Sequence, residues 1–218
     1  MQDYKNKIEL IGSYGGDLEH ALSAWTSTSR DLTPEKQARI PALLKQLAEH
    51  GHHTPFEKSA ISFLVDTDIC SHIHELKHRI GVSINGESAR YKELKEDKYY
   101  IPADWPEVWQ ERLHEHTKQG LQIYHECIAS LTNNYDINRK RAKESARYFR
   151  TLNTQINSDI MFNFRSFAHF YNLRADEAAQ KEIRWIAEEM RNQIANIPGN
   201  PFKYTLEAFG MDKPKETQ

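Results

Sequence analysis

The sequence predicts a single α+β domain with much helix and few strands. Apolar residues recur at helical spacing in several long stretches, whereas only two segments have the character of a strand. No internal repeat or low-complexity linker divides the 218 residues, a length that suits one large domain. Hydrophobic residues make up 39% of the chain and charged residues 28%, a balance that supports a globular core.

Both predicted strands are short apolar segments with recognisable boundaries. Residues 7–14 (KIELIGSY) begin like a strand and stop at the glycine pair Gly15 and Gly16. Residues 59–65 (SAISFLV) have the composition of a buried strand, and the compact polar turn HGHHTPFE precedes them. Few strands in a mostly helical chain leave limited room for a hydrophobic core within one subunit, which suggests an oligomer.

The first long helix is predicted from the residues at its ends. Thr33 suits the N-cap position and Pro34 the first helical position, while Gly51 suits the end of the helix. Pro41 falls inside this stretch. Because proline is tolerated in the first turn of a helix, the sequence predicts that the helix restarts at Pro41.

Apolar spacing predicts five further helices. They are expected over residues 71–79, 107–131, 137–150, 154–171 and 176–197. The last is the clearest, because Ile183, Ile186, Met190 and Ile194 keep the helical period. A polar tail from about residue 211 (MDKPKETQ) is expected to fray at the end of a domain that covers residues 1–218.

Bulk properties exclude several classes of protein. A net charge of −2 argues against a general nucleic-acid binder, and no apolar run approaches the roughly 20 residues of a membrane-spanning helix. The N-terminal residues MQDYKNKIEL lack the apolar region of a signal peptide. Cys70 and Cys127 form no CxxC pair and suggest no disulfide framework, so a reducing cytoplasm is expected.

Two groups of histidines raise the possibility of a metal site. His50, His52 and His53 form one group, and His72, His74 and His78 form the other. A metal-dependent nucleotide phosphohydrolase is therefore one hypothesis. However, neither group has the ligand spacing of a known metal motif such as HExxH, and we expect no metal site.

No catalytic nucleophile or common nucleotide motif stands out. Cys70 follows a predicted strand and is expected to pack as a small apolar residue. Ser88 has no base specified by spacing, so its hydroxyl is better suited to contact a phosphate. The sequence holds neither GxGxxG after a strand nor GxxxxGK[ST], which disfavours a Rossmann or P-loop site.

Charged and hydrogen-bonding side chains that suit phosphate and planar polar rings gather in residues 77–91 (KHRIGVSINGESARY) and on a later predicted helix. Arginine forks suit phosphate and the imide edge of a pyrimidine, and Arg90, Arg147 and Arg174 stand beside aromatic or amide residues. On a helix that spans residues 163–172, Arg165, His169 and Asn172 would share one side, which could line a cofactor groove or a subunit interface. Two further expectations concern this region. Asn163 should point roughly the other way, and the nearby phenylalanines should pack in the core.

Residues 77–91 resemble the signature RHRxxSxNExSxRY of the flavin-dependent thymidylate synthases. Residues 52–57 (HHTPFE) are similar to the turn HxTPFE of that family. The stretch from Asn163 (NFRSFAHFYNLRADEAAQKEI) resembles its NxRSLxxFLxLRxxxxAQxEI. The resemblance extends from about Ser27 to Ile197. The chain departs from the signature in three ways. Lys77 replaces its first Arg, and one extra residue lies between Arg79 and Ser83. The Glu that follows the Asn of the signature is Gly86 here, and Glu87 comes one place later.

The resemblance implies a fold and a reaction. The fold is a single domain with a small, mostly antiparallel sheet packed by several long helices. The enzyme would methylate dUMP to dTMP with carbon from 5,10-methylenetetrahydrofolate and a hydride from FAD that NADPH has reduced. It would be a homotetramer with shared active sites. The alternatives are the phosphohydrolase above and a non-catalytic dUMP-binding paralogue.

The resemblance also implies residue roles. The positive charge of Arg174 would stabilise an N3-deprotonated pyrimidine, which removes the need for a cysteine nucleophile. The residues expected to bind dUMP are His74, Lys77, Gly86, Glu87, Ser88, Ala89, Arg90, Arg147 and Arg174. The residues expected to bind FAD are Ser27, His52, Thr54, Lys77, His78, Arg79, Glu87, Asn163, Arg165 and His169.

Overall fold

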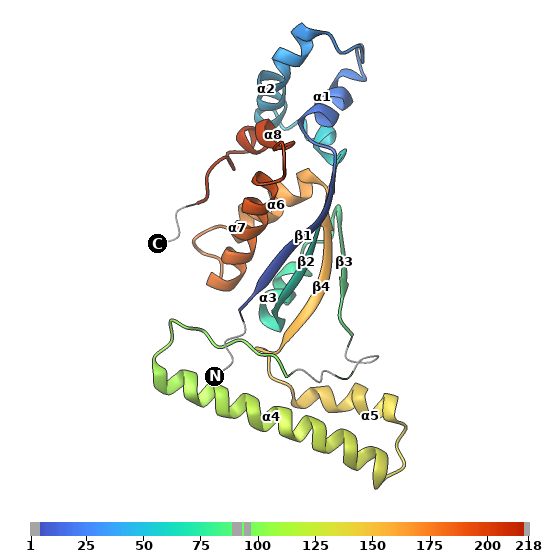
Figure 1. The fold of residues 1–218 in the computed structure, drawn as a ribbon, viewed down its shortest axis with the longest axis vertical. Coiled ribbons are helices and arrows are strands. Elements are labelled where there is room, and N and C mark those ends of the chain that lie inside the picture. Colours follow the sequence, from blue (N-terminus) through green and yellow to red (C-terminus); the bar gives the residue numbers. More distant parts are fainter. Residues whose placement is uncertain (1–4, 89–92, 94–96, 216–218) are drawn as a thin grey trace. The chain divides into compact units, whose positions relative to one another are not determined.

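A computed structural model describes residues 5–88, 93 and 97–215, and Figure 1 shows the arrangement of its elements. The strands are β1 (Lys7–Tyr14), β2 (Ala60–Asp68), β3 (Val82–Gly86) and β4 (Gln155–Phe162). The α-helices are α1 (Asp17–Trp25), α2 (Pro34–Glu49), α3 (Ile69–Glu75), α4 (Glu107–Asn133), α5 (Arg139–Ala146), α6 (Phe164–Arg174), α7 (Lys181–Ala195) and α8 (Lys203–Ala208). Two 3₁₀ turns, η1 (Thr54–Glu57) and η2 (Arg147–Phe149), complete the set. This architecture confirms the predicted α+β class.

The chain forms two compact units, which are described one at a time below. The core unit comprises Ile8–Val65, His74–Ile84 and Asp159–Gln218. The α4 unit comprises Met1–Lys7, Asp66–Ile73 and Asn85–Ser158. No helix in the described part of the chain is both long and apolar enough to cross a membrane.

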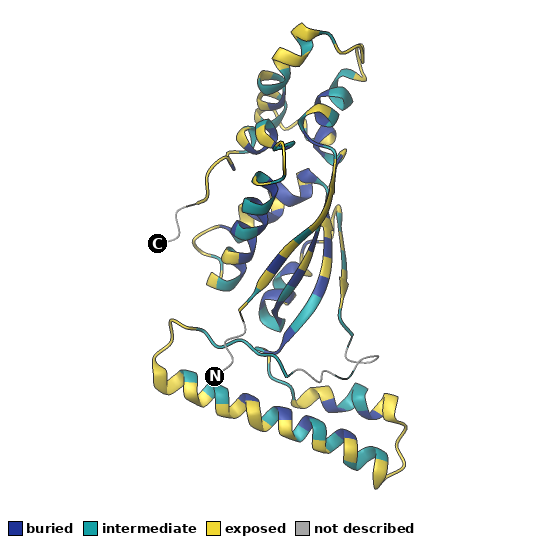
Figure 2. Cartoon of the chain, viewed as in Figure 1, coloured by how far each residue is buried: buried dark blue, intermediate teal, exposed yellow. Residues whose placement is uncertain are grey.

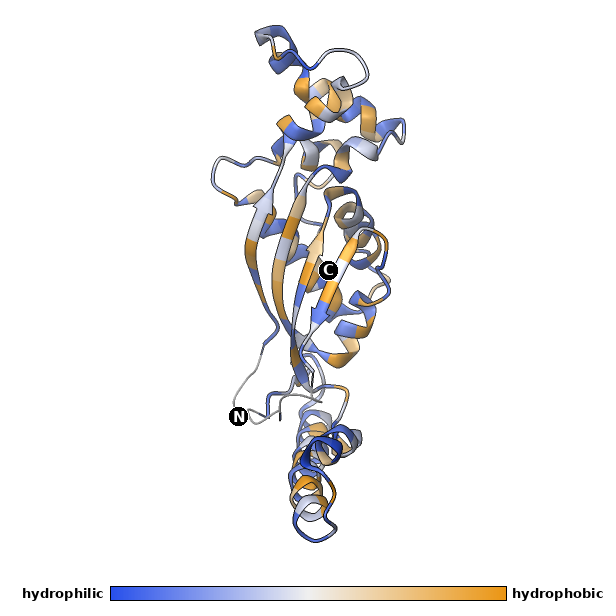
Figure 3. Ribbon diagram, turned by 90° about the vertical axis from the view of Figure 1, so that its right-hand side faces the viewer, coloured by the Kyte–Doolittle hydropathy of each residue, from blue (hydrophilic) through white to orange (hydrophobic). Residues whose placement is uncertain are grey.

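One face of the antiparallel sheet, whose strand order is β1-β2-β4-β3, packs against helices in the core unit. Ile61, Phe63 and Val65 on β2 are fully buried and alternate with more exposed neighbours, as period-2 strand geometry requires. They pack with the apolar faces of α6 and α7. Figure 2 shows buried residues gathered on these elements, and Figure 3 shows apolar and polar residues alternating along the strands.

Helix α2 begins where the sequence predicts but does not restart. The Thr33 hydroxyl accepts a hydrogen bond from the Lys36 N–H at 3.3 Å, and Pro34 occupies the first turn. The helix continues through Pro41, so the predicted restart is wrong. Proline lacks only its own N–H, and the neighbouring turns of this 16-residue helix remain hydrogen-bonded around it.

Residues 154–171 form a strand and a helix, not the single predicted helix. In β4, the side chains of Ser158, Ile160 and Phe162 are buried with period 2, whereas Asp159 and Met161 are exposed. Asn163 ends this alternation, because its side-chain oxygen accepts the Ser166 N–H at 2.9 Å and starts α6. The apolar spacing that predicts α6 continues backwards into the residues of β4, so the sequence predicts one helix where the structure has a strand and a helix.

Three elements of the core unit or its edge were not predicted: α1, β3 and α8. Strand β3 lies inside the polar segment 77–91 and is only five residues long (VSING), so the β-branched residues Val82 and Ile84 give too short a strand signal among polar neighbours. Helices α1 and α8 are short and are joined by polar contacts. The Asp17 carboxylate accepts hydrogen bonds from the Thr205 hydroxyl at 2.6 Å and the Thr205 N–H at 2.7 Å.

Part of the expected polar tail, within residues 211–215, is also packed in the core unit. Met211, the first residue of the expected tail, is fully buried. Lys215 N–H donates to the Glu188 carboxylate at 3.1 Å, and the Tyr171 hydroxyl donates to the same oxygen at 2.8 Å. The described part of the tail therefore contacts both α6 and α7.

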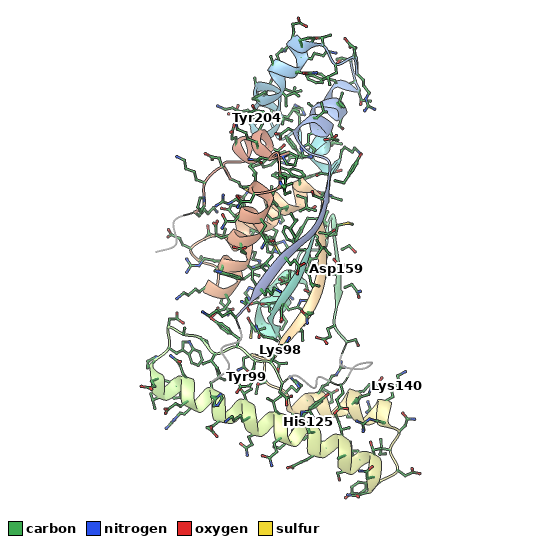
Figure 4. The ribbon with its side chains drawn as sticks, in the orientation of Figure 1. Lys98, Tyr99, His125, Lys140, Asp159 and Tyr204 are labelled. Carbon is green, nitrogen blue, oxygen red and sulfur yellow. The ribbon has the colours of Figure 1, made fainter. Side chains whose placement is uncertain are left out.

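The α4 unit is built on the antiparallel contact of α4 with α5 and η2. Tyr124, Ile128 and Ala146 form its small apolar cluster. Two polar contacts tie the segment before α4 to the helix itself. The Tyr99 hydroxyl lies 2.8 Å from His114 Nδ1, and the Asp97 carboxylate lies 3.1 Å from His125 Nε2. Figure 4 labels Tyr99 and His125 among the side chains of this unit.

His20 on α1 is a fully buried histidine in the core unit. Its ring meets Phe56 edge-on at 5.3 Å, and its Nδ1 lies 3.0 Å from the Thr205 hydroxyl. Burial lowers the pKa of His20 to about 4, because the apolar surroundings disfavour the charged ring. The folded protein therefore holds His20 neutral where the unfolded chain would bind a proton.

We predict that this histidine makes stability fall with acidity. A lowered folded pKa contributes stability that is complete above about pH 6.5 and is lost as the pH falls toward 4. Between pH 7 and 5 the unfolding free energy should drop by about 2 kcal/mol from this group. Urea titrations of wild type and His20→Leu measure it, and His20→Leu should lack that part of the pH dependence.

His116→Leu, at an exposed position on α4, is the matched control and should keep the wild-type pH dependence. His78 has a pKa lowered in the same direction, so the comparison between variants, not the wild-type slope alone, isolates His20. Equal slopes for wild type and His20→Leu would contradict the assignment.

Gly81, just before β3, lies against the N-terminal turn of α6. Its φ is 68°, in the left-handed region, and a Cβ there would clash with the side chains of Ser166 and Asn163. Its carbonyl accepts the Asn163 N–H at 3.3 Å, and the neighbouring Ile80 carbonyl accepts the Ser166 hydroxyl at 2.8 Å. Only a glycine allows this close approach.

We predict that Gly81→Ala costs more stability than Gly51→Ala. Both glycines have positive φ, but a Cβ at Gly51 meets nothing within 4 Å. Gly51→Ala should cost about 1 kcal/mol, the price of a left-handed alanine, and Gly81→Ala about 1–2 kcal/mol more for the clash. If denaturant titrations gave equal losses of unfolding free energy for the two variants, α6 would be able to shift and admit the Cβ, and the prediction would be wrong.

Candidate active site

A cavity of about 540 Å³ opens in the core unit along α6. Its lining comes from η1, the segment before β3, α6, and the residue that follows α8. The lining residues are His53, Glu57, Ile80, Gly81, Asn163, Arg165, Ser166, Ala168, His169, Asn172 and Phe209. Several of these side chains are polar or charged, although the sheet-facing side of α6 is apolar.

The polar face of α6 is the main wall of this cavity. Arg165, His169 and Asn172 line it together, which confirms that they share one side of the helix. Phe164, Phe167 and Phe170 lie on the opposite side and are fully buried, as expected for core residues. One amphipathic helix therefore separates the core from the cavity.

Asn163 also lines the cavity, so the expectation that it points away is wrong. It is the N-cap of α6 and lies outside the helix proper, so helical spacing does not set its direction. The Phe164 N–H donates to the Ser59 hydroxyl at 3.1 Å and the Ser166 N–H donates to Asn163 Oδ1, but the helix dipole still places a partial positive charge at this end, beside Arg165. This end of the cavity suits an anionic group.

Arg165 is held by a carboxylate from η1. Its Nη1 lies 2.5 Å from Glu57 Oε1, and both side chains line the cavity. Glu57 closes the TPFE turn, whose Phe56 is fully buried and fixes the turn on the core. The ion pair thus places a guanidinium beside the α6 N-terminus, and it leaves Arg165 half exposed to a ligand.

Arg174, the last residue of α6, is held by one group from the end of α3 and one from the segment that follows it. Its Nε donates to His78 Nε2 at 2.9 Å, and its Nη2 approaches the His74 carbonyl oxygen at 3.5 Å. His78 is buried, with its ring edge-on to Phe170 at 5.0 Å. Burial first, then the charges of Arg174 and His169, lower the pKa of His78 to about 4.

The other residues expected to bind FAD occupy varied positions. In the core unit, Lys77 and Arg79 flank His78 and are exposed. Ser27, His52 and Thr54 are also exposed, and none of the three lines the cavity. The Ser27 hydroxyl donates to the Ala24 carbonyl at 3.1 Å, at the end of α1.

The remaining residues expected to bind dUMP belong to the α4 unit, and two lie outside the described residues. Gly86 ends β3, and the Glu87 N–H donates to the Asn157 carbonyl at 2.7 Å. Ser88 is partly buried, and Arg147 is exposed at the start of η2. Ala89 and Arg90 fall outside the part of the chain that the structure describes.

Sequence reasoning missed several cavity residues. His53, instead of its neighbour His52, faces the cavity, and its ring lies 5.4 Å from that of Phe209. Phe209 is remote in sequence and carries no motif that could have found it. Gly81 and Glu57 could have been found, because Gly81 is an unusual residue inside a polar signature and Glu57 ends a recognised turn.

The chemistry of these residues fits a flavin nucleotide better than a metal. Among the described residues, no group of three or more His, Cys, Asp or Glu side chains could hold a metal ion. The cavity instead offers the Arg165 guanidinium and the Asn163 side chain at the start of α6. His53, Phe209 and Ile80 provide ring and apolar surface for a planar group.

Comparison with known proteins places the chain in a family. The sequence model of a family described as "Thymidylate synthase complementing protein" matches residues 9–198. A flavin-dependent thymidylate synthase of Thermosipho africanus is 32% identical, over 94% of this chain and 91% of the relative. Its counterpart in Thermosipho melanesiensis is 33% identical, over 94% and 90%.

A solved structure has the same fold. The UMP/dUMP methylase PolB from Streptomyces cacaoi, bound with 5-Br dUMP, superposes with a TM-score of 0.77 and 25% sequence identity. The match covers 95% of this chain and 96% of that one. Because the family match spans most of the chain and relatives above 30% identity cover nearly all of it, this protein belongs to the flavin-dependent thymidylate synthase family.

Proposed function

We propose that this protein converts dUMP to dTMP, with 5,10-methylenetetrahydrofolate as carbon donor and FAD reduced by NADPH as hydride source. The observation that carries the proposal is the arrangement of α6. Its polar face lines a cavity suited to a flavin nucleotide, and its last residue is the arginine expected to activate the pyrimidine. An 11-residue helix spans about 16 Å, so one rigid element positions both groups.

FAD would be held on the cavity side of α6. We assign Asn163, Arg165 and His169 to it, supported by their place in the cavity wall. Lys77, His78, Arg79 and Glu87, with Ser27, His52 and Thr54, are assigned by the family resemblance. When bound, the flavin supplies the hydride, and the protein orients it against the pyrimidine ring.

dUMP would be activated by charge and not by a thiol. The guanidinium of Arg174 would stabilise negative charge that develops when the pyrimidine loses its N3 proton. His74, Lys77, Gly86, Glu87, Ser88, Ala89, Arg90 and Arg147 are assigned to dUMP by the resemblance. The ligand of the Streptomyces cacaoi structure, 5-Br dUMP, belongs to the same class of nucleotide.

We further propose that the chain acts as a single catalytic domain in a homotetramer with shared active sites, and that it works in the cytoplasm. Large exposed side chains on the described surface support an assembly, among them Trp105, Trp109 and Tyr148. Cys70 and Cys127 are not joined in a disulfide, which is compatible with a reducing compartment.

The first prediction of the proposed function concerns the bound flavin and the reaction. Purified protein should be yellow or become so when reconstituted with FAD, because an oxidised flavin absorbs visible light. It should release tritium from 5-tritiated dUMP when methylenetetrahydrofolate and NADPH are present. Protein that binds dUMP and FAD without turnover would identify a non-catalytic paralogue, and protein that binds neither would refute the proposal.

The second prediction concerns Arg174. Arg174→Ala should lower kcat by about 100- to 1000-fold, because one preorganised positive group is removed from the developing charge. The variant should keep its circular dichroism spectrum, since the Arg174 side chain is only partly buried at the end of α6. Arg39→Ala, at an exposed position on α2, is the control and should keep the wild-type kcat. An unchanged kcat in Arg174→Ala would remove this role.

A further inference from the structure

We propose that His78 is a positioning residue for Arg174, and that its Nε2 acts as the acceptor that orients the guanidinium toward the pyrimidine. This inference rests on the proposed function and deepens it. The family resemblance assigns His78 to FAD, whereas the structure places its ring directly on the arginine expected to activate dUMP.

The hydrogen bond fixes the protonation state of the imidazole ring. Every nitrogen of a guanidinium carries hydrogen and none accepts, so Arg174 Nε must be the donor in the 2.9 Å contact with His78 Nε2. Nε2 must then be unprotonated, and the proton of the neutral ring resides on Nδ1. A doubly protonated His78 would set two donors and two positive charges against each other, and the contact would break.

The surroundings of His78 keep the ring neutral and still. Its side chain is almost fully buried, and Phe170 and His169 on α6 meet it edge-on at 5.0 Å and 5.8 Å. The backbone N–H of His78 donates to the Glu75 carbonyl at 3.0 Å, which ties the residue to the end of α3. The charged or titratable groups that act on the ring are Arg174 and His169, and both lower its pKa further below the value set by burial.

Two contacts restrict the guanidinium while leaving most of it available. Nε is held by His78, and Nη2 approaches the His74 carbonyl oxygen. A long, flexible arginine at a helix end would otherwise sample many rotamers, at an entropic cost to any ordered complex. Of its five N–H groups, these contacts use at most two, and the others remain for the substrate.

The same ring connects Arg174 to the flavin cavity. His169, which contacts the His78 ring, also lines that cavity, and Lys77 and Arg79 on either side of His78 are assigned to FAD. A ligand that moves His169 or the 77–79 segment therefore moves the acceptor of Arg174. The orientation of the activating charge would depend on whether the flavin is in place.

Three substitutions of His78 separate its hydrogen bond from its bulk. His78→Gln can place an amide oxygen near the position of Nε2, whereas the shorter His78→Asn can reach only the position of Nδ1. His78→Phe keeps an aromatic ring for packing and removes the acceptor. We expect His78→Phe and His78→Asn to lower kcat by about 10- to 100-fold, and His78→Gln to recover a large part of that loss.

The pH profile of kcat is the decisive readout. If Arg174 is misdirected, the pyrimidine N3 proton becomes harder to remove, so the limb of the profile that rises with pH should shift upward in His78→Phe and return in His78→Gln. A role in fold stability alone would not move that limb. Visible absorbance is recorded for each variant, so that loss of flavin is measured separately from loss of rate.

The outcomes distinguish the two proposals. A wild-type protein without FAD binding or tritium release would refute the proposed function itself. An active wild type whose kcat and pH profile are unchanged in His78→Phe would overturn the positioning role. Should His78→Phe fail to fold or to bind FAD, the Gln and Asn variants decide, because equal kcat in these two would also overturn it.

Discussion

The junction between β4 and α6 is the constraint on which the site depends. Asn163 ends the strand and caps the helix within a single residue, so the chain turns from a buried sheet into a helix with no intervening loop. The start of α6 is thereby fixed relative to the sheet. Because cap and strand are adjacent, any change in strand register would move the cavity wall and Arg174 together.

Aromatic packing then sets the rotation of α6 about its axis. Phe164, Phe167 and Phe170 are fully buried in the main apolar core, and this leaves one orientation in which the polar side chains face the cavity. The large apolar area buried by these rings stabilises that orientation far more than the exposed Arg165–Glu57 ion pair could. Hydrophobic packing orients the helix, and the polar groups refine the positions of single side chains.

Sequence periodicity predicted the elements whose faces differ most and failed where two signals overlap. The apolar stripe of α7 and the cap of α2 were found because each depends on neighbouring residues. The segment 154–171 was read as one helix, because β4 precedes α6 without a Gly or Pro to separate them. The motif residues indicated the chemistry, but contacts such as His53 with Phe209 and His78 with Arg174 join distant segments, and helical or strand spacing carries no information about them.

The extra residue between Arg79 and Ser83 has a consequence for how such proteins are recognised. Ile80 is 91% exposed and Gly81 adopts a left-handed conformation, so the added length is absorbed in a short turn before β3. In this chain the turn at Ile80 and Gly81 therefore lengthens the spacing between Arg79 and Ser83 by one residue relative to the signature. A fixed-spacing search pattern would overlook chains of this kind, and a pattern that allows a gap at this turn would retrieve them.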